Sequence, residues 1–285
     1  MSERWKITLL LFPALFIIGG LFLGGLVFGL AGSLGYMPLI GLTDWSLDAY
    51  HRILSSDSFY LSFVVTFYIA FTSTLISGCL ALGAALMLRQ TFAGRSVINF
   101  LFQINLSVPH LVGAVGILYL FSQSGVFARL AFEFNMISKP ADFPAMIYDP
   151  LSIGIILQYV WKEVPFIGLI LLANLQTIGT NYEAVARTLG ASHWQTFRYV
   201  LLPLLLPGLL SASMIVFAFT FGAYEIPALL GQNYPTALPV LAYQAFTNVN
   251  LGSRPEAMAM AMIIALMSGL MIIGYARLAR RYIRD

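Results

Sequence analysis

Long stretches without charge dominate this sequence. Five of them contain no Asp, Glu, Lys or Arg over at least the ~20 residues that a helix needs to cross a bilayer: residues 7–43, 58–88, 96–128, 199–224 and 257–276. A sixth stretch, 151–179, is interrupted only by Lys162 and Glu163. Only 9% of the residues are charged, against roughly 25% in soluble domains. These features exclude an ordinary soluble fold and predict six membrane spans.

The expected fold is therefore all-α, an integral membrane six-helix bundle formed by one transmembrane domain over residues 1–285. We place the spans at about 7–31, 58–88, 96–122, 151–179, 199–231 and 256–280. The first apolar run exceeds the ~7–15 residues of a signal-peptide core, so we interpret it as an uncleaved span.

Several expected spans contain proline, which removes a backbone donor and predicts a bend. These prolines are Pro109, Pro165, Pro203, Pro207 and Pro227. The stretch 125–134, of mixed polarity, predicts a short helix in one of the two long loops, which cover 123–150 and 232–255.

The distribution of Lys and Arg sets the orientation, because these residues concentrate on the cytoplasmic side of membrane proteins. With six spans, the side that holds both termini carries ten of them and the other side four. The ten are Arg4, Lys6, Arg89, Arg95, Arg187, Arg198, Arg277, Arg280, Arg281 and Arg284. Both termini are thus expected in the cytoplasm. The net charge of +3 follows from the basic residues expected on the cytoplasmic side of the lipid membrane. It does not indicate a nucleic-acid partner.

A charged segment, 181–198, separates the fourth and fifth expected spans on the cytoplasmic side. Residues 182–189 read as a short helix in which Glu183 precedes Arg187 by four positions, the favourable order for a surface ion pair. Gly190 stands where a helix-ending glycine is placed. Ser192 and Gln195 then form an S-x-x-Q capping box that starts a second helix. From chemistry alone, two interpretations stay open: a rigid knob for a soluble partner, or a plain amphipathic surface helix.

This segment resembles the EAA loop of permease subunits of ATP-binding cassette importers. The family pattern is E-A-A, three residues, Gly, nine residues, then I-x-L-P. Gly190 is followed after nine residues by Val200, Leu202 and Pro203, so the second half matches at full spacing. In the first half, Ala184 stands at the position of the pattern's Glu, followed by Val185 and Ala186, and the chain's own acid, Glu183, lies one residue earlier.

The resemblance extends to residues 47–77, to the stretch YVWKEVPF at 159–166 and to the six-span layout, which look like the spermidine/putrescine branch of this family. It implies a bacterial inner-membrane protein that works with two cytoplasmic ATPases, a second permease subunit and an extracytoplasmic binding protein. The unusual Ala184 favours a paralogue over a second copy as the other permease. The residues that the resemblance assigns to coupling with the ATPase are Glu183, Ala184, Ala186, Arg187, Gly190, Ala191 and Ser192.

The chain has no phosphate-binding G-x-x-x-x-G-K-[ST] motif, so ATP and Mg²⁺ are expected on the partner ATPases and no cofactor on this chain. No catalytic residue is assigned. Its single cysteine, Cys79, cannot supply a metal cluster or an internal disulfide, and no metal site is expected.

Ionisable residues inside spans are costly and are candidates for function. Lys162 and Glu163 lie near the middle of the fourth expected span, and Glu225 lies in the fifth. Neighbouring helical residues point about 100° apart, so Lys162 and Glu163 are expected to have different partners. The candidate substrate pathway comprises Trp161, Lys162, Glu163, Phe221, Tyr224 and Glu225. The alternative is that the three charges form interhelical ion pairs that hold the bundle together.

The transported solute is expected to be a polyamine or a related small cation, with iron, thiamine, phosphonate and sulfate as alternatives. A secondary transporter would show inverted repeats around broken helices, and an intramembrane enzyme would show metal-binding spacing or G-x-S-x-G. We find neither pattern, and both classes leave the EAA-like loop unexplained.

Overall fold

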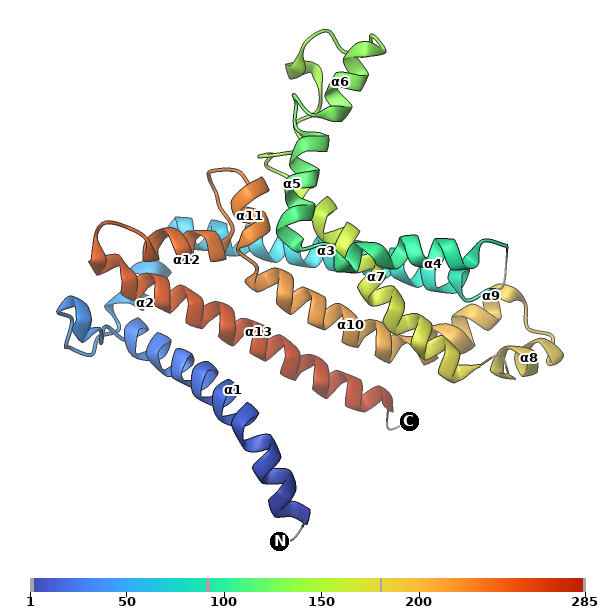
Figure 1. Ribbon diagram of the computed structural model, residues 1–285, viewed down its shortest axis with the longest axis horizontal. Coiled ribbons are helices and arrows are strands. Elements are labelled where there is room, and N and C mark those ends of the chain that lie inside the picture. Colours follow the sequence, from blue (N-terminus) through green and yellow to red (C-terminus); the bar gives the residue numbers. More distant parts are fainter. Residues whose placement is uncertain (1–2, 91–92, 180, 284–285) are drawn as a thin grey trace. The chain divides into compact units, whose positions relative to one another are not determined.

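The computed structural model describes residues 3–90, 93–179 and 181–283, and within these ranges it is built from helices without a β-strand (Figure 1). The α-helices are α1 (Glu3–Ser33), α2 (Asp48–Leu54), α3 (Asp57–Leu88), α4 (Arg95–Ile104), α5 (His110–Phe121), α6 (Val126–Glu133), α7 (Ile153–Ile178), α8 (Asn181–Thr188), α9 (His193–Thr196), α10 (Leu202–Gly222), α11 (Glu225–Leu230), α12 (Leu238–Phe246) and α13 (Arg254–Ile283). Shorter turns are η1 (Pro38–Ile40), η2 (Asn105–Ser107), η3 (Pro140–Asp142), η4 (Phe197–Leu201) and η5 (Leu251–Ser253).

Six helical segments of the described residues are long and apolar enough to cross a membrane, which confirms the expected number of spans. They cover Trp5–Ser33, Asp57–Leu88, His110–Glu133, Ile153–Ile178, His193–Gly222 and Leu251–Gly274. The short helix expected within 125–134 is also present, as α6.

The third span differs from the expected continuous helix over 96–122. Helix α4 ends at Ile104, η2 follows, and α5 begins only at His110. Val108 is extended, as residues before proline prefer, and Pro109 has no N–H to continue a helical ladder. The expected bend at Pro109 is therefore a complete break.

The expected fifth span over 199–231 is also interrupted. Helix α10 ends at Gly222, Ala223 is extended, and α11 starts at Glu225. Pro227 lies in the first turn of α11, where its missing N–H costs no helical hydrogen bond. At the other end, η4 is a π-helical turn ahead of Pro203. A wider turn is a common adjustment where a proline crowds the preceding carbonyl groups.

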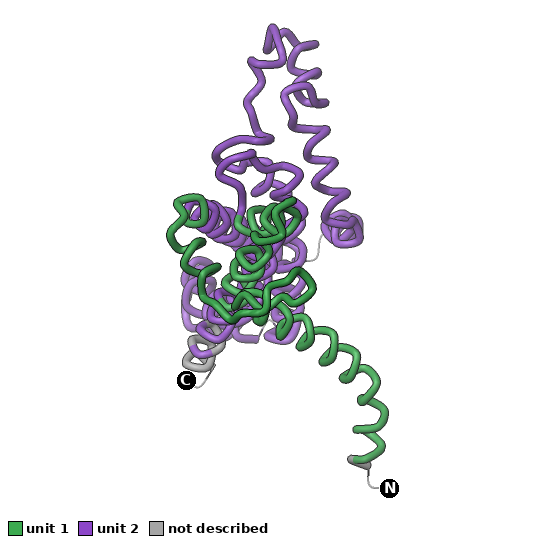
Figure 2. Tube along the Cα trace, turned by 90° about the vertical axis from the view of Figure 1, so that its left-hand side faces the viewer, with its two compact units in different colours: residues 1–60, 238–266 green, residues 61–237, 267–285 purple. Residues whose placement is uncertain are grey.

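The chain divides into two compact units, coloured separately in Figure 2. Unit 1 comprises residues 1–60 and 238–266, and unit 2 comprises residues 61–237 and 267–285. The single domain over residues 1–285 stays a prediction.

Polar contacts near the ends of its helices stabilise unit 1. The hydroxyl of Tyr50 donates to Ser33 Oγ at 2.9 Å. Arg52 pairs with Glu256 at 2.6 Å, and the guanidinium of Arg254 lies 5.3 Å from the centre of the Phe246 ring. These contacts join α1, α2, α12 and the start of α13.

Helix α7 is the centre of unit 2 and packs against α4, α5, α10 and α11. One apolar core joins it to α3 and α10, through side chains such as Ala85, Leu171 and Leu205. Lipid tails are as apolar as leucine, so helices in a membrane associate by close packing and polar contacts. Gly113 of α5 shows this closeness, since a Cβ there would lie 2.5 Å from Gln158 Nε2 of α7.

Candidate functional site

The charged segment between the fourth and fifth spans forms a helix, a sharp turn and a second helix, as its sequence predicts. Helix α8 ends in a turn where Gly190 has φ 86°. The N–H of Gly190 donates to the Arg187 carbonyl and that of Ala191 to the Ala186 carbonyl, which is the hydrogen-bond pattern of a Schellman motif. Glycine suits this turn because the left-handed conformation is strained for residues with a Cβ.

The second helix begins with the predicted capping box. The N–H of Gln195 donates to Ser192 Oγ at 3.3 Å, and the N–H of Ser192 donates to Gln195 Oε1 at 2.8 Å. Helix α9 then continues through η4 into α10. The start of the fifth span is thus fixed to α8 by a short turn whose hydrogen bonds are local.

This segment exposes four large apolar side chains, which we call together the apolar face: Tyr182, Val185, Leu189 and Trp194. Their exposed fractions are 58%, 58%, 83% and 67%. Tyr182, Val185 and Leu189 follow the helical spacing of three and four that places side chains on one side. Ala184, Arg187 and Ser192 are exposed as well, whereas Ala186 is buried and Ala191 half-buried.

Glu183 points away from the apolar face. It is buried and forms a two-pronged ion pair with Arg89, whose two terminal nitrogens lie 2.5 and 2.9 Å from its two carboxylate oxygens. The ion pair expected between Glu183 and Arg187 is therefore wrong. Arg187 is exposed and lies 3.2 Å from His193 Nδ1 instead. The planar guanidinium of Arg89 can bind both carboxylate oxygens of Glu183 at once. The site is less exposed to water than the surface position of Arg187.

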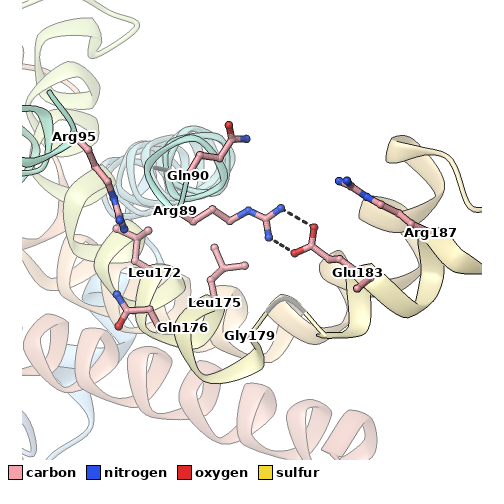
Figure 3. A pocket seen from close by; sticks show the side chains of 10 residues that line it. Arg89, Gln90, Arg95, Leu172, Leu175, Gln176, Gly179, Glu183 and Arg187 are labelled. Carbon is pink, nitrogen blue, oxygen red and sulfur yellow. Dashed lines mark hydrogen bonds and ion pairs between the residues drawn. The ribbon is translucent and has the colours of Figure 1, made fainter. Parts of the chain in front are cut away.

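A cavity of about 770 Å³ surrounds this ion pair (Figure 3). It lies between the C-terminal ends of α3 and α7 and the first turns of α4 and α8. Its lining residues are Arg89, Gln90, Arg95, Leu172, Leu175, Gln176, Gly179, Glu183, Ala184 and Arg187.

Lys162 is buried and faces the break in the third span. Its Nζ donates to the carbonyls of Asn105 at 2.6 Å and Val108 at 2.7 Å, and lies 3.4 Å from that of Leu106. The side-chain amide of Asn105 donates in return to the carbonyl of Trp161. The ammonium thus binds carbonyl groups at the break, where the Val108 carbonyl faces no continuing helical turn and the Asn105 carbonyl also accepts from the N–H of Val108.

Glu163 is buried and accepts hydrogen bonds from two other helices. The Thr220 hydroxyl of α10 lies 2.6 Å from Oε1, and the Ser77 hydroxyl of α3 lies 3.2 Å from Oε2. Lys162 and Glu163 have different partners, as the geometry of a helix predicts. Their partners are uncharged, so interhelical ion pairs are wrong for these two residues. Hydrogen bonds perform that structural role.

The other candidate pathway residues differ in burial. Phe221 is fully buried and packs its ring against those of Phe63 and Phe217. Trp161 and Tyr224 are partly exposed, and Glu225 is an exposed residue at the start of α11. Their part in a pathway stays a prediction.

Sequence reasoning missed several partners of these charges. In the sequence, Arg89 counted only as one of the basic residues that set the orientation in the membrane. Its position directly after a long apolar run gave no indication of a partner. Ser77 and Thr220 are common residues in membrane helices. Asn105 carried a clearer signal, because an amide in an otherwise apolar stretch requires polar partners.

Comparison with known proteins decides the family. Residues 77–284 match the family described as "Binding-protein-dependent transport system inner membrane component". The chain belongs to this family. It is a permease subunit of an ABC importer, located in the bacterial inner membrane as a multi-pass protein, and it is not the ATPase.

The relatives of this chain are named for the transport of different solutes. The permease is 26% identical to the sulfate transport system permease protein of Escherichia coli (strain K12) over 85% of its own length and 84% of the relative. It is 30% identical to the trehalose/maltose transport system permease protein of Thermococcus litoralis, over 75% of its length and 71% of the relative. The narrower spermidine/putrescine branch is therefore not established.

The fold of the permease has a solved counterpart. A bacterial ABC transporter described as importing the acidic polysaccharide alginate contains a chain that matches with a TM-score of 0.79. The match covers 98% of the permease and 96% of that chain at 18% identity, so it supports the fold alone.

Proposed function

We propose that this permease assembles with two cytoplasmic ATPase subunits, a second and paralogous permease subunit and an extracytoplasmic binding protein, and that the complex imports a small solute. The observation that carries the proposal is the apolar face on a capped helix–turn–helix between two spans. Exposed apolar patches on well-ordered elements are typical of protein interaction sites. Family membership identifies the partner class as the subunits of a binding-protein-dependent transport system.

The apolar face suits docking into a groove of an ATPase. Burying its aromatic and aliphatic side chains releases on the order of 1.5–3 kcal/mol for each large residue, and aromatic residues such as Trp194 dominate interfaces of this kind. The Schellman turn and the capping box fix the two helices against each other before binding, which lowers the entropy cost of docking. ATP and Mg²⁺ would be held by the ATPases, and this chain would convert their closure into movement of its spans.

Introducing a charge into the apolar face tests this docking. We expect Leu189→Glu and Trp194→Glu each to lower the amount of ATPase that co-purifies with the tagged permease by about tenfold or more. Mass spectrometry of the complex extracted in mild detergent measures this amount. Val249→Glu is the matched control, because Val249 is 97% exposed in a loop of unit 1. Undiminished ATPase with both face variants would disprove the docking role.

For the solute, resemblance of sequence segments favours a polyamine, and the sulfate permease relative favours a small oxyanion. The buried acid Glu163 is fully engaged by Ser77 and Thr220 in this conformation. The polyamine proposal therefore depends on Glu225 and on the resemblance. Uptake of labelled spermidine and of labelled sulfate by the complete complex, each with competition by the other solute, distinguishes the two.

A further inference from the structure

The Arg89–Glu183 pair joins two elements that lie far apart in the sequence. Arg89 directly follows the last residue of α3, and Glu183 lies in the first turn of α8, 94 residues later. Arg52–Glu256, the other ion pair among the described residues, lies in unit 1. The Arg89 and Glu183 side chains are 26% and 11% exposed, whereas those of Arg52 and Glu256 are 53% and 29% exposed.

Both members of the pair are fixed to rigid helices. The N–H of Arg89 donates to the carbonyl of Ala85, which extends the last turn of α3, and Leu88 beside it is buried in the apolar core. Glu183 belongs to the buried side of α8 together with Ala186. The link therefore joins two helices through side chains whose own backbones have little freedom.

The pair crosses the cavity rather than a packed interface. Arg89 reaches from the end of α3 to the carboxylate of Glu183, with Leu175 and Gly179 of the α7 end below it (Figure 3). Displacements normally pass between helices through close-packed side chains. Where a cavity replaces that packing, a directional contact can carry the displacement.

The geometry of the contact suits this purpose. Two parallel N–H···O bonds hold the guanidinium and the carboxylate in one plane, which resists both sliding and rotation. Partial burial strengthens the attraction relative to a fully exposed pair, and loss of either partner leaves a charge with less water around it. A lysine would restore the charge without the two-pronged geometry.

We propose that Arg89 and Glu183 are positioning residues that make α8 and the C-terminal end of α3 move together, so that displacement of α8 by the ATPase reaches the α3 span. This inference rests on the proposed function. It assigns Glu183 to a contact within the permease, so the docking surface for the ATPase is the apolar face and not this acid.

A charge swap in the complete reconstituted transporter tests the link. The variants are Arg89→Glu, Glu183→Arg and the double variant with both changes, and Arg52→Glu is the matched control at the more exposed ion pair. ATP hydrolysis and solute uptake are measured together in proteoliposomes. We expect each single reversal to lower the solute moved per ATP hydrolysed by about tenfold, which corresponds to a typical coupling free energy. We expect the double variant to recover to within about threefold of wild type, as the coupling of contacting residues requires.

The outcomes separate the possible explanations. Single variants that transport normally would overturn the inference, as would a double variant no better than the singles. Recovery in the double variant shows that the singles failed through the lost pair. A misfolded single variant would lose ATP hydrolysis together with uptake, whereas a lost link lowers the solute moved per ATP hydrolysed. A wild-type permease that binds no ATPase would overturn the proposed function itself, whereas normal wild-type uptake beside unaffected single variants would overturn this inference alone.

Discussion

Lys162 and Glu163 are neighbours in the sequence, yet their charges serve different helices. Lys162 binds the carbonyls exposed at the break between α4 and α5, and Glu163 binds hydroxyl groups of α3 and α10. The low dielectric of the membrane interior makes each such contact costly to lose. These two residues therefore hold four helices around the middle of α7.

The hydrogen bonds from Lys162 to the break in the third span predict a clear loss of stability for Lys162→Met. The substitution keeps much of the side-chain volume but removes the donor to the Val108 carbonyl, at a cost of about 1–3 kcal/mol for an unsatisfied group. The Asn105 carbonyl keeps the hydrogen bond from the N–H of Val108. The midpoint of thermal unfolding in detergent should fall by several degrees relative to wild type, since about 1 kcal/mol corresponds to roughly 2–4 °C in a chain of this size.

Lys139→Met is the control for this prediction, because Lys139 is an exposed lysine of an outer loop. Its midpoint should stay near that of wild type. Equal midpoints for Lys162→Met and wild type would show that Lys162 does not secure the break.

Glu225 offers a residue-level test of the solute. As an exposed carboxylate at the start of α11, it would attract a cation and repel an oxyanion. If the solute is a polyamine, Glu225→Gln should reduce spermidine uptake several-fold while the complex still assembles. Glu133→Gln, at an exposed acid of α6, is the control. Unchanged spermidine uptake in Glu225→Gln would remove the remaining structural support for a polyamine.

Among the elements, the α8–α9 turn was predictable in detail because the interactions that define it are local. The Schellman hydrogen bonds and the Ser192–Gln195 box join residues no more than five positions apart. The break at Pro109 was predictable only as a bend, since the lysine that binds its carbonyl groups, Lys162, lies more than 50 residues away on α7. The Arg89–Glu183 pair was not predictable, because 94 residues separate its members and Arg187 offered a nearer partner in the sequence.

The same turn predicts how the coupling segment can be impaired without loss of the fold. Gly190→Leu forces a side chain into a φ of 86°, although a Cβ there meets no atom within 4 Å. The strain of about 1–2 kcal/mol should therefore change the angle between α8 and α9 instead of causing a clash. The protein should remain in the membrane at wild-type levels while solute uptake is lost.

Gly41→Leu is the matched control, because Gly41 has a φ of 82° and equally open surroundings in another turn. Gly190→Asn should also retain more uptake than Gly190→Leu, since asparagine tolerates this conformation. Normal uptake by Gly190→Leu would rule out a coupling role for the turn.

For the whole molecule, the number of spans followed from charge-free runs, and the family followed from the EAA-like loop. Neither the charge-free runs nor the EAA-like loop predicted the identity of the transported solute. Glu163 is hydrogen-bonded by Ser77 and Thr220, and Lys162 by the carbonyl groups at the break in the third span. In this conformation these contacts report how the helices are held and not what passes between them. The test of the solute therefore rests on an exposed position such as Glu225.

The local character of the α8–α9 turn has a consequence for biosynthesis. The Arg89 partner of Glu183 precedes it in the chain, and the hydrogen bonds that define the turn are complete at Gln195. The turn and the Arg89 contact of α8 can therefore form while the ribosome is still synthesising most of the last two spans. The segment that we propose as the docking site can thus be ordered before the permease itself is finished.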